Sequence, residues 1–334
     1  MAKLPGVPTI KRIAIVSPYP PPGGRIFQGS GIVQYSRGLA EALARHFEVH
    51  VVADSLEGVP AEYSENGVFI HRVFRSNPLY PLRIFRQLLR IRPDIVHVQH
   101  SYFLYGGFLE GALLPLLLAM SRLISKVVIT LHDLPSMRQL DDVNFLRMNS
   151  LPAHRSILKA GIVAINRSIA ALADAVIVHE DSLREVAIRD YHMPISKVIV
   201  RPHGMERVRP LDRGRARASL GVDDDRVLVL FFGYLARYKG VDLLVDVLRN
   251  RLDKRRYSLM IVGGPHPRAR GDPGYRTWLR NLLDKVNEAR REGADVRLTG
   301  FVEDPSPYFS AADLVVLPYV ERFSASGPAS IAMA

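Results

Sequence analysis

Short runs of apolar, often β-branched residues alternate along the whole chain with longer segments of helical periodicity. This alternation constrains the fold most, because strands separated by helices pair in parallel, and a parallel sheet covered on both faces needs near-continuous apolar strands. Seven strands are predicted in the first part of the chain, at residues 12–17, 49–53, 68–74, 95–99, 127–131, 175–179 and 197–201. Four more are predicted afterwards, at residues 226–232, 258–262, 296–298 and 314–317.

The two groups of strands predict an α/β chain with two doubly wound, Rossmann-like domains. The turn Arg201-Pro-His-Gly-Met205 separates them, so we expect residues 1–203 to form one domain and residues 204–334 a second, incomplete one. A length of 334 residues is usual for two domains. Ligands of such folds bind at the carboxyl ends of the strands, and the loops there are the places to search for function.

The most apolar segment, residues 108–125, is about as long as a membrane span. Glu110, Pro115 and Arg122 interrupt it, and we therefore expect a buried helix and not a transmembrane one. Residues 1–11 lack the apolar run of a signal peptide, which predicts a cytoplasmic protein. The chain has no cysteine, which excludes disulfides and thiolate metal sites.

The formal net charge of +12 comes mainly from arginine, with 37 Arg against 8 Lys. One interpretation is attraction to anionic partners such as sugar nucleotides or acidic lipid headgroups, and the other is an arginine-rich composition unrelated to binding. No nucleic-acid motif accompanies the charge, so no nucleic-acid partner is expected. Arg83, Arg86, Arg90 and Arg92 have helical spacing, which fits either a peripheral contact with the inner membrane face or a solvated helix face.

A proline- and glycine-rich loop follows the first predicted strand, and Gly29 and Gly31 stand where the next helix opens. Glycines there let a ligand approach backbone N–H groups closely, while the alternative is a long surface turn. The loop is not the dinucleotide fingerprint, because Val33 and Gln34 occupy the place of the third glycine.

His132 and Asp133 follow the strand predicted at residues 127–131. The imidazole of His132 is suited to bind a sugar hydroxyl or a phosphate oxygen, or it caps the strand and pairs with Asp133. Other histidines, among them His179 and His203, also fall near strand ends, so the position alone discriminates little. His97 lies inside a strand and is expected to be a hydrogen-bonded core residue.

Lys239 precedes Gly240 at a predicted strand-to-helix junction, where an ammonium group is placed to neutralise a diphosphate. The run Asp223-Asp-Asp225 resembles a divalent-metal motif, but it follows Gly221 and precedes an apolar strand. We therefore expect a turn there, and no bound metal.

The end of the chain reads as a strand, a Glu-x-Phe turn at Glu321, and a small-residue loop that opens a helix. Gly327 is predicted at the N-cap and Pro328 at the first helical position, and such a helix start suits a phosphate. The chain stops about two turns later. We expect it to be either a fragment of a longer protein or an unusually short one.

The order of these motifs resembles the retaining glycosyltransferases of family 4, which have the GT-B fold. The motifs run in the family's order over nearly the whole chain. They are the glycine loop, Leu-His-Asp at 131–133, Arg-Pro-His-Gly at 201–204, Phe-Gly-Tyr…Tyr-Lys-Gly at 232–240, Ile-Val-Gly-Gly at 261–264, Thr-Gly-Phe-Val at 299–302, and Ala-Ala-Asp-Leu-Val-Val-Leu-Pro at 311–318.

The resemblance implies that the N-terminal domain binds an acceptor, which is a glycan, a lipid-linked sugar or a small molecule. It implies that the C-terminal domain binds a nucleotide-diphosphate sugar, and that the sugar is transferred with retention of configuration and without a metal cofactor. The residues that match the family's catalytic positions are His132 beside the transferred sugar, Lys239 on the diphosphate and Glu321 on the sugar. Gly29, Gly31, Gly233 and Lys239 match donor-binding positions of the family. Ser324, Ser326 and Gly327 are also expected to bind the donor, through their hydroxyls and backbone N–H groups at the predicted helix start.

The chain departs from the family pattern at two places. Tyr234 follows Gly233 where the family has an arginine, and Ala329 stands where the family has a second glutamate, eight residues after Glu321. The segment 324–327 replaces that glutamate with hydroxyls and backbone N–H groups. Two other functions therefore stay open: a nucleotide-sugar epimerase of the same fold, and a degenerate, non-catalytic nucleotide-binding subunit.

Overall fold

The computed structural model describes residues 10–23, 31–102, 104–148, 155–204, 210–266, 269 and 271–333. The chain divides into two compact units. The first unit consists of residues 1–137, 154–206 and 323–325, and the second of residues 138–153, 207–322 and 326–334. Two short segments, 138–153 and 323–325, thus belong to a different unit from the sequence around them.

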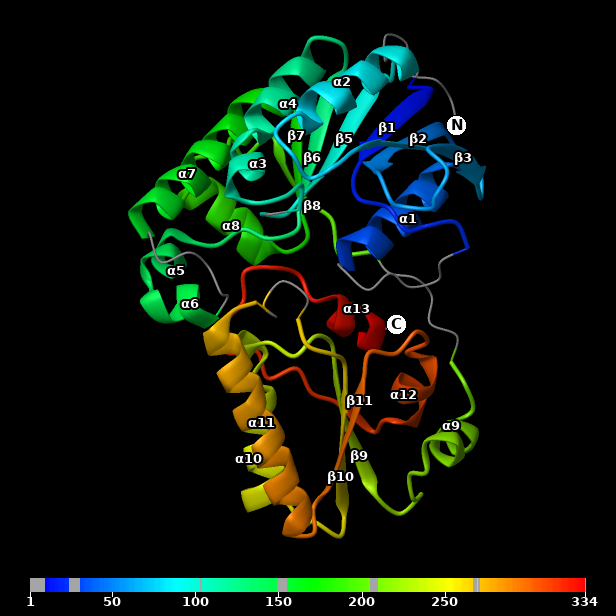
Figure 1. Cartoon of the computed structure of the whole chain (residues 1–334), viewed down its shortest axis with the longest axis vertical. Coiled ribbons are helices and arrows are strands. Elements are labelled where there is room, and N and C mark those ends of the chain that lie inside the picture. The colour runs from blue at the N-terminus through cyan, green and yellow to red at the C-terminus, as the bar shows by residue number, and fades with distance from the viewer. Residues whose placement is uncertain are drawn as a thin grey trace. The chain divides into compact units, whose positions relative to one another are not determined.

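The first unit is built on one sheet whose strands have the order β3-β4-β2-β1-β5-β6-β7-β8. All neighbours are parallel except β3 and β4. The strands are β1 (Arg12–Val16), β2 (Glu48–Asp54), β3 (Glu62–Glu65), β4 (Val68–Phe74), β5 (Ile95–His100), β6 (Lys126–Leu131), β7 (Ala175–Val178) and β8 (Val198–Val200) (Figure 1). The seven strands predicted here are confirmed, whereas β3 was missed because its sequence Glu-Tyr-Ser-Glu is polar and lies at the sheet edge.

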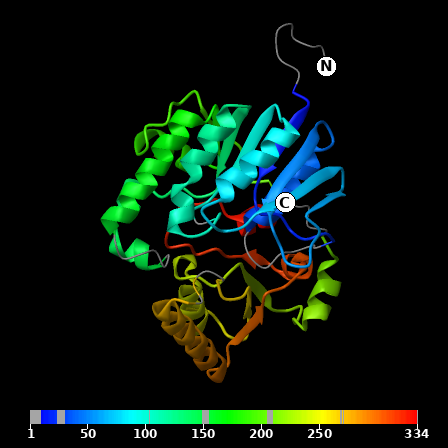
Figure 2. The same ribbon diagram turned by 45° about the horizontal axis from the view of Figure 1, so that its top comes forward.

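Helices cover both faces of this sheet. Helices α2 (Tyr80–Ile91), α4 (Leu114–Arg122) and α7 (Arg155–Leu172) lie side by side on one face (Figures 1 and 2). Helix α1 (Gly31–Leu43) packs on the other face, where its Ala40 joins Ile15 and Val51 in a buried cluster. Helix α8 (Asp181–Arg189) follows β7.

The apolar segment 108–125 forms two helices, α3 (Phe108–Ala112) and α4, and not the single helix expected. Pro115 lies in the first turn of α4, where backbone N–H groups have no partner within the helix, so its missing N–H loses no hydrogen bond. In the interior of one long helix, the same proline would lose a hydrogen bond and clash with the preceding turn, and the segment therefore divides into two helices. Leu114, Leu117 and Leu118 of α4 are buried, as expected for a core helix. Among the described residues, no helix has the length and apolarity needed to cross a membrane.

The second unit is a smaller parallel sheet with the order β11-β10-β9-β12. Its strands are β9 (Val227–Phe232), β10 (Tyr257–Val262), β11 (Asp295–Gly300) and β12 (Leu314–Val315), so the four strands predicted here are confirmed. The helical elements are α5 (Met137–Asp141, from residue 138), α6 (Val143–Met148), α9 (Arg213–Leu220), η1 (Arg237–Lys239), α10 (Val241–Arg251), α11 (Pro273–Arg291), α12 (Ser306–Ala311) and α13 (Gly327–Met333).

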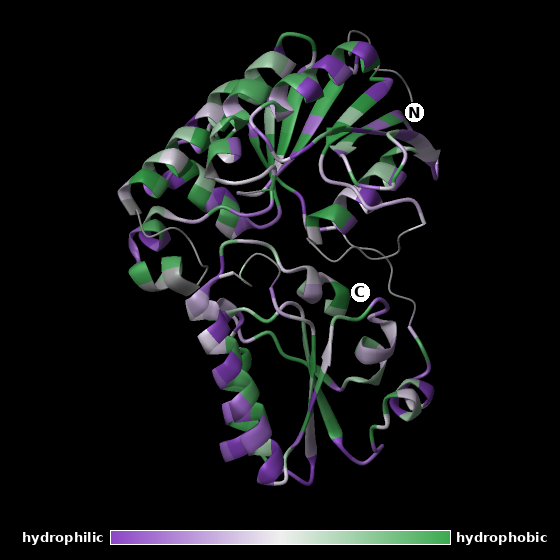
Figure 3. Ribbon diagram, in the orientation of Figure 1, coloured by the Kyte–Doolittle hydropathy of each residue, from purple (hydrophilic) through white to green (hydrophobic). Residues whose placement is uncertain are grey.

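Alternate residues of the second unit's strands face opposite layers of helices. Phe231 packs with α10 and α11, and Leu230 packs with α9 and α12. Figure 3 shows β9 as largely hydrophobic and α11 as largely hydrophilic. This two-sided covering is the doubly wound arrangement predicted from the near-continuous apolar strands.

Arg217 of α9 is fully buried in the layer of helices formed by α9 and α12, and it links several segments of that layer. Its guanidinium pairs with Asp313 and donates to the carbonyl oxygens of Ala311 at 3.1 Å, Asp223 at 2.9 Å and Asp224 at 3.2 Å. Asp223 and Asp224 are exposed and lie in the turn before β9, which confirms that the acidic run is a turn.

We expect Arg217→Leu to destabilise the second unit by about 3–5 kcal/mol, because it leaves Asp313 and several carbonyl groups without their buried partner. Arg213→Leu is the matched control: Arg213 pairs with the same carboxylate, but its side chain is 51% exposed, and the expected loss is below about 1 kcal/mol. Urea unfolding followed by the fluorescence of Trp278, the chain's single tryptophan, reports on this unit. Equal effects of the two substitutions would contradict the role given to Arg217.

Candidate functional site

The carboxyl ends of β6, β7 and β8 bring polar side chains together in the first unit. The strands are in register so that Leu131 pairs with Val178, and Val178 pairs with Val200. The next residues, His132 and His179, therefore lie beside each other on the same face of the sheet, because side chains alternate along a strand. The sequence predicted that both histidines lie near strand ends, and the register of β6 and β7 brings the two side chains next to each other.

Hydrogen-bond contacts hold these two imidazole rings in place. His132 Nε2 lies 2.9 Å from Gln99 Oε1, and His132 Nδ1 lies 3.2 Å from His179 Nε2. His179 Nδ1 lies 3.0 Å from the carbonyl oxygen of Arg201. A third ring, His203, has its centroid 4.9 Å from that of His179, and its Nδ1 is buried without a hydrogen-bond partner among the described residues.

Tyr35 of α1 packs against all three imidazoles, with ring centroids 4.8 Å from His132, 5.2 Å from His179 and 4.9 Å from His203. Burial raises the pKa of Tyr35 to about 12. Burial also lowers the pKa values of His132 and His179, and that of His203 to about 4. The cluster of His132, His179 and His203, called the histidine cluster below, is therefore neutral at neutral pH.

His132 thus has both ring nitrogens in contact with groups of the first unit, and the residue is only 5% exposed. Its neighbour Asp133 accepts hydrogen bonds from Ser101 Oγ at 2.5 Å and from the backbone N–H of Tyr102 at 3.2 Å. His97, expected in the core, is buried and contacts Thr130 Oγ1 at 2.8 Å through Nε2, which confirms that prediction.

The other predicted residues of the first unit lie at its loops. Gly31 is the first residue of α1, and Gly29 lies outside the described residues. Ser324 forms an antiparallel bridge with Asp133, and the N–H of Leu134 donates to the carbonyl oxygen of Phe323 at 2.8 Å. The structure therefore brings Ser324 next to the strand end that carries His132.

In the second unit, Lys239 ends the short helix η1 and is only 8% exposed. Its Nζ lies 5.8 Å from the ring centroid of Tyr319 and 6.0 Å from that of Tyr238. Burial lowers the pKa of Lys239 to about 8. Among the described residues, no carboxylate forms an ion pair with this ammonium group, and an uncompensated buried charge is costly. The arrangement favours an anion that comes from outside the protein.

Glycines allow the loops around Lys239 to approach one another. A Cβ on Gly263, which has φ of +147°, would lie 1.9 Å from the carbonyl oxygen of Gly233. A Cβ on Gly240, with φ of +66°, would lie 2.2 Å from the carbonyl oxygen of Pro318. Only glycine fits both the conformation and the space at these two positions.

Helix α13 begins at Gly327, one residue earlier than predicted, and its N-cap is Ser326 and not Gly327. Ser326 Oγ accepts from the N–H of Ala329 at 3.2 Å, which is the side-chain hydrogen bond of an N-cap and one that a glycine cannot supply. The same hydroxyl lies 3.0 Å from the hydroxyl of Tyr319. The structure thus links Ser326 to Tyr319, whose ring faces Lys239.

Glu321 is half-buried, and its Oε2 accepts a hydrogen bond from Gln139 Nε2 at 2.9 Å. Gln139 Nε2 also donates to the carbonyl oxygen of Arg322 at 3.0 Å. Gln139 belongs to the second unit, although it lies far from Glu321 in the sequence. Sequence analysis missed it because no periodicity or motif marks a glutamine in that segment.

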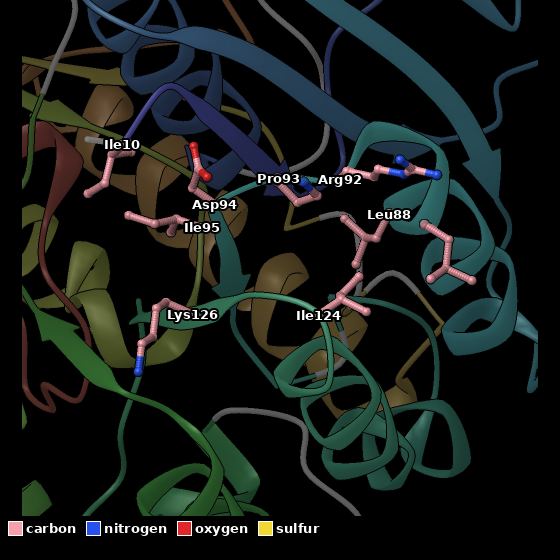
Figure 4. Close-up of a pocket in the computed structure, with 9 residues that line it drawn as sticks. Ile10, Leu88, Arg92, Pro93, Asp94, Ile95, Ile124 and Lys126 are labelled. Atoms are coloured by element: carbon pink, nitrogen blue, oxygen red, sulfur yellow. The ribbon is translucent and has the colours of Figure 1, made fainter. Parts of the chain in front are cut away.

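A hollow in the first unit lies at the opposite, amino-terminal edge of the sheet and is lined by apolar residues such as Leu88 and Ile124 (Figure 4). Two of its charged groups, Asp94 and Lys126, have partners within the first unit. Asp94 accepts from the backbone N–H groups of residues 11 and 12, which lowers its pKa, and Lys126 pairs with Asp174 at 3.4 Å. Ligands of such sheets bind at the carboxyl ends, so this hollow is not the candidate site.

Two protein-family models match the chain. Glycosyltransferase Family 4 matches residues 29–209, which is more than half of the chain, and Glycosyl transferases group 1 matches residues 226–334. D-inositol 3-phosphate glycosyltransferase 1 of Catenulispora acidiphila is 26% identical over 238 residues, which are 67% of this chain and 50% of that protein. The chain therefore spans about half the length of this relative.

Two solved structures resemble more than nine-tenths of the chain. Sucrose-phosphate synthase of Thermosynechococcus elongatus has a TM-score of 0.67 at 19% identity, over 93% of this chain and 76% of that chain. HepE of Anabaena, in complex with UDP-glucose, has a TM-score of 0.58 at 17% identity, over 91% of this chain and 72% of that chain. These likenesses show the fold, which is GT-B with two Rossmann-like sheets, as expected.

The buried ammonium of Lys239 predicts an unusual pH dependence. Because its pKa is about 8 in the folded state and 10.5 in the unfolded state, only the unfolded state holds the proton between these values. Stability should therefore rise from pH 8 to 10.5 by up to about 3 kcal/mol relative to the Lys239→Met variant. The measurement is urea unfolding followed by Trp278 fluorescence at several pH values. Parallel pH profiles of the two proteins would show that the ammonium is solvated.

Proposed function

We propose, because the chain belongs to glycosyltransferase family 4, that it passes a sugar from a nucleotide-diphosphate sugar to an acceptor hydroxyl. The observation that carries this proposal is the buried ammonium of Lys239, which has no carboxylate partner among the described residues. A diphosphate supplies the missing charge, and it is also the leaving group of a nucleotide sugar. HepE, which has the same fold, was solved with UDP-glucose, and this supports the choice of ligand class.

The second unit is the proposed donor-binding part. Lys239 would stabilise the charge that develops on the departing diphosphate, a preorganised electrostatic role. Gly233 allows this approach, since a Cβ there would lie 2.8 Å from Lys239 Nζ and 3.5 Å from Pro328 Cγ. Ser326 and Gly327, at the start of α13, complete the proposed donor-binding set in this unit.

Tyr234 stands where the family has an arginine, and Arg237 is the first arginine after Gly233 in the sequence. Its guanidinium points toward the first turn of α11, because a Cβ on Gly274 would lie 3.0 Å from Arg237 Nη2. Lys239 is therefore the cation on which the diphosphate proposal rests. Its effect is large because burial removes the screening that weakens an exposed cation.

Glu321 is the residue proposed to orient the transferred sugar, with Gln139 fixing the direction of its carboxylate. The first unit is proposed to bind the acceptor. The role of His132 beside the sugar stays a prediction, as do those of Gly29, Gly31 and Ser324.

Lys239→Met should weaken binding of UDP or GDP by about 1.5–3 kcal/mol, the scale of a hydrogen bond to a charged group. Binding of the corresponding nucleoside, which has no diphosphate, should change much less. Lys285→Met is the matched control, because Lys285 belongs to the same unit but pairs with Asp246 at 2.6 Å. Isothermal titration of each protein with nucleotide and nucleoside gives the comparison. Unchanged UDP and GDP affinity in Lys239→Met would remove the basis of the donor site.

The reaction itself is tested by incubating the chain with UDP-, GDP- and ADP-sugars, with and without added acceptors. Acceptor-dependent release of nucleoside diphosphate is the expected result, and NMR of the new glycosidic bond should show retained configuration. Interconversion of sugars without an acceptor would make the chain an epimerase. Tight nucleotide binding without any turnover would make it a non-catalytic subunit, and either outcome would overturn the transferase proposal.

A further inference from the structure

The ring nitrogens of the histidine cluster converge on one point in the first unit. One nitrogen each of His132, His179 and His203 lies within 4.8 Å of the other two. Two of these atoms, His132 Nδ1 and His179 Nε2, are 3.2 Å apart. The proposed sugar transfer makes no use of His179 or His203, so these two imidazoles call for another explanation.

The groups on the outer side of two rings are oxygen acceptors. His179 Nδ1 faces the carbonyl oxygen of Arg201 at 3.0 Å, and His132 Nε2 faces the amide oxygen of Gln99 at 2.9 Å. A ring nitrogen that faces an oxygen acceptor carries the hydrogen of a neutral imidazole, so the inner nitrogens carry lone pairs. Metal-binding histidines show this pattern, in which the outer N–H donates to a carbonyl oxygen and the inner nitrogen faces the ion.

A plain hydrogen-bond chain is the competing arrangement. It requires the Gln99 side-chain amide to be turned, so that its nitrogen donates to His132 Nε2 and His132 Nδ1–H donates to His179 Nε2. This chain accounts for two of the rings. It gives no partner to His203 Nδ1, which is buried and unpaired among the described residues.

We propose that His132, His179 and His203 bind one divalent transition-metal ion of the zinc type. Zinc–nitrogen bonds of about 2.0–2.1 Å in tetrahedral geometry place two ligand nitrogens about 3.4 Å apart. The 3.2 Å between His132 Nδ1 and His179 Nε2 is close to this spacing. Imidazole ligands favour zinc, copper, nickel or iron, whereas magnesium, calcium and manganese prefer oxygen ligands.

Such an ion would hold the ends of β6 and β7 and the segment after β8 in one arrangement. Three protein ligands leave a fourth position for water or for a ligand oxygen. The histidine cluster lies in the first unit, whereas the proposed diphosphate site lies in the second. The metal proposal therefore does not rest on the proposed transferase activity, and it differs from the expectation that no metal is bound.

The direct test uses the full chain without a histidine tag, stripped with EDTA and dialysed. Titration with Co²⁺ is expected to give the visible absorption of tetrahedral cobalt, saturating at one ion per chain, and Zn²⁺ should displace it. His179→Gln and His203→Gln should each weaken Co²⁺ binding at least roughly tenfold, since even second-shell changes cost about ten- to hundredfold.

His71→Gln is the matched control, because a second histidine pair exists in the same unit. His50 Nδ1 lies 3.0 Å from His71 Nε2, and the outer nitrogens of these rings face Glu48 and Glu62. The control should bind Co²⁺ like the parent. Loss of binding in His71→Gln with retention in His203→Gln would assign the metal to the pair of His50 and His71 and overturn the proposal.

Further outcomes would also overturn it: no stoichiometric binding of Co²⁺ or Zn²⁺ by the parent, or equal binding by parent, His179→Gln and His203→Gln. Circular dichroism of each variant checks folding. If His179→Gln does not fold, His203→Gln decides, because His203 lies after β8 in a loop and is only half-buried. Nucleotide affinity measured before and after EDTA treatment should agree within about threefold, well under 1 kcal/mol, which separates a failure of this proposal from a failure of the donor site.

Discussion

The register of the parallel strands β5, β6, β7 and β8 is the constraint on which the first unit's polar site depends. In register, Gln99 pairs with Thr130, and the residues that follow Leu131 and Val178 come side by side. A shift of one residue in any strand would send its histidine to the opposite face, because side chains alternate. The apolar residues of the strands fix that register, since they must face the helices on both sides. Core packing therefore determines the positions of His132 and His179.

The second unit depends on a different constraint, which is the close approach of loops around a buried cation. Gly240 and Gly263 permit backbone contacts that any side chain would block. These contacts bury Lys239 close to the ring of Tyr319. Burial disfavours the charged form and lowers the pKa of Lys239 to about 8. Burying this ammonium group lowers the stability of the folded protein, because the group forms no ion pair among the described residues. An anion bound at this strand-to-helix junction would offset the loss by pairing with the ammonium group.

The strands were predictable from sequence because parallel strands covered on both faces are continuous apolar runs. The edge strand β3 was not, since Glu62 and Glu65 look like loop residues and only pairing with β4 makes them a strand. The break between α3 and α4 could not be predicted from hydropathy, because the segment is apolar on both sides of it. Pro115 lies in the first turn of α4, where a proline is tolerated, and only the structure shows that a new helix begins there. Local pattern gives the elements, and their exact ends depend on tertiary contacts.

The site residues divide in the same way. The burial of Lys239 and the capping by Ser326 follow from the packing of loops, which no spacing in the sequence reveals. His179 was visible as a residue at a strand end, but counting residues from the paired strands was needed to place it beside His132. Gln139 had no signal at all, because its contact with Glu321 joins segments that are distant in sequence.

The two units offer chemically different environments, and this difference argues against the net charge as the source of specificity. The exposed arginines of α2, such as Arg83, Arg86 and Arg90, act on anions only through a field that salt screens within about 10 Å. Lys239 is a single buried cation, and its attraction for a diphosphate is screened far less. The histidine cluster is uncharged and offers lone pairs. Under the proposed function, anion selection rests on one buried ammonium in the second unit, and the proposed metal site lies in the first unit.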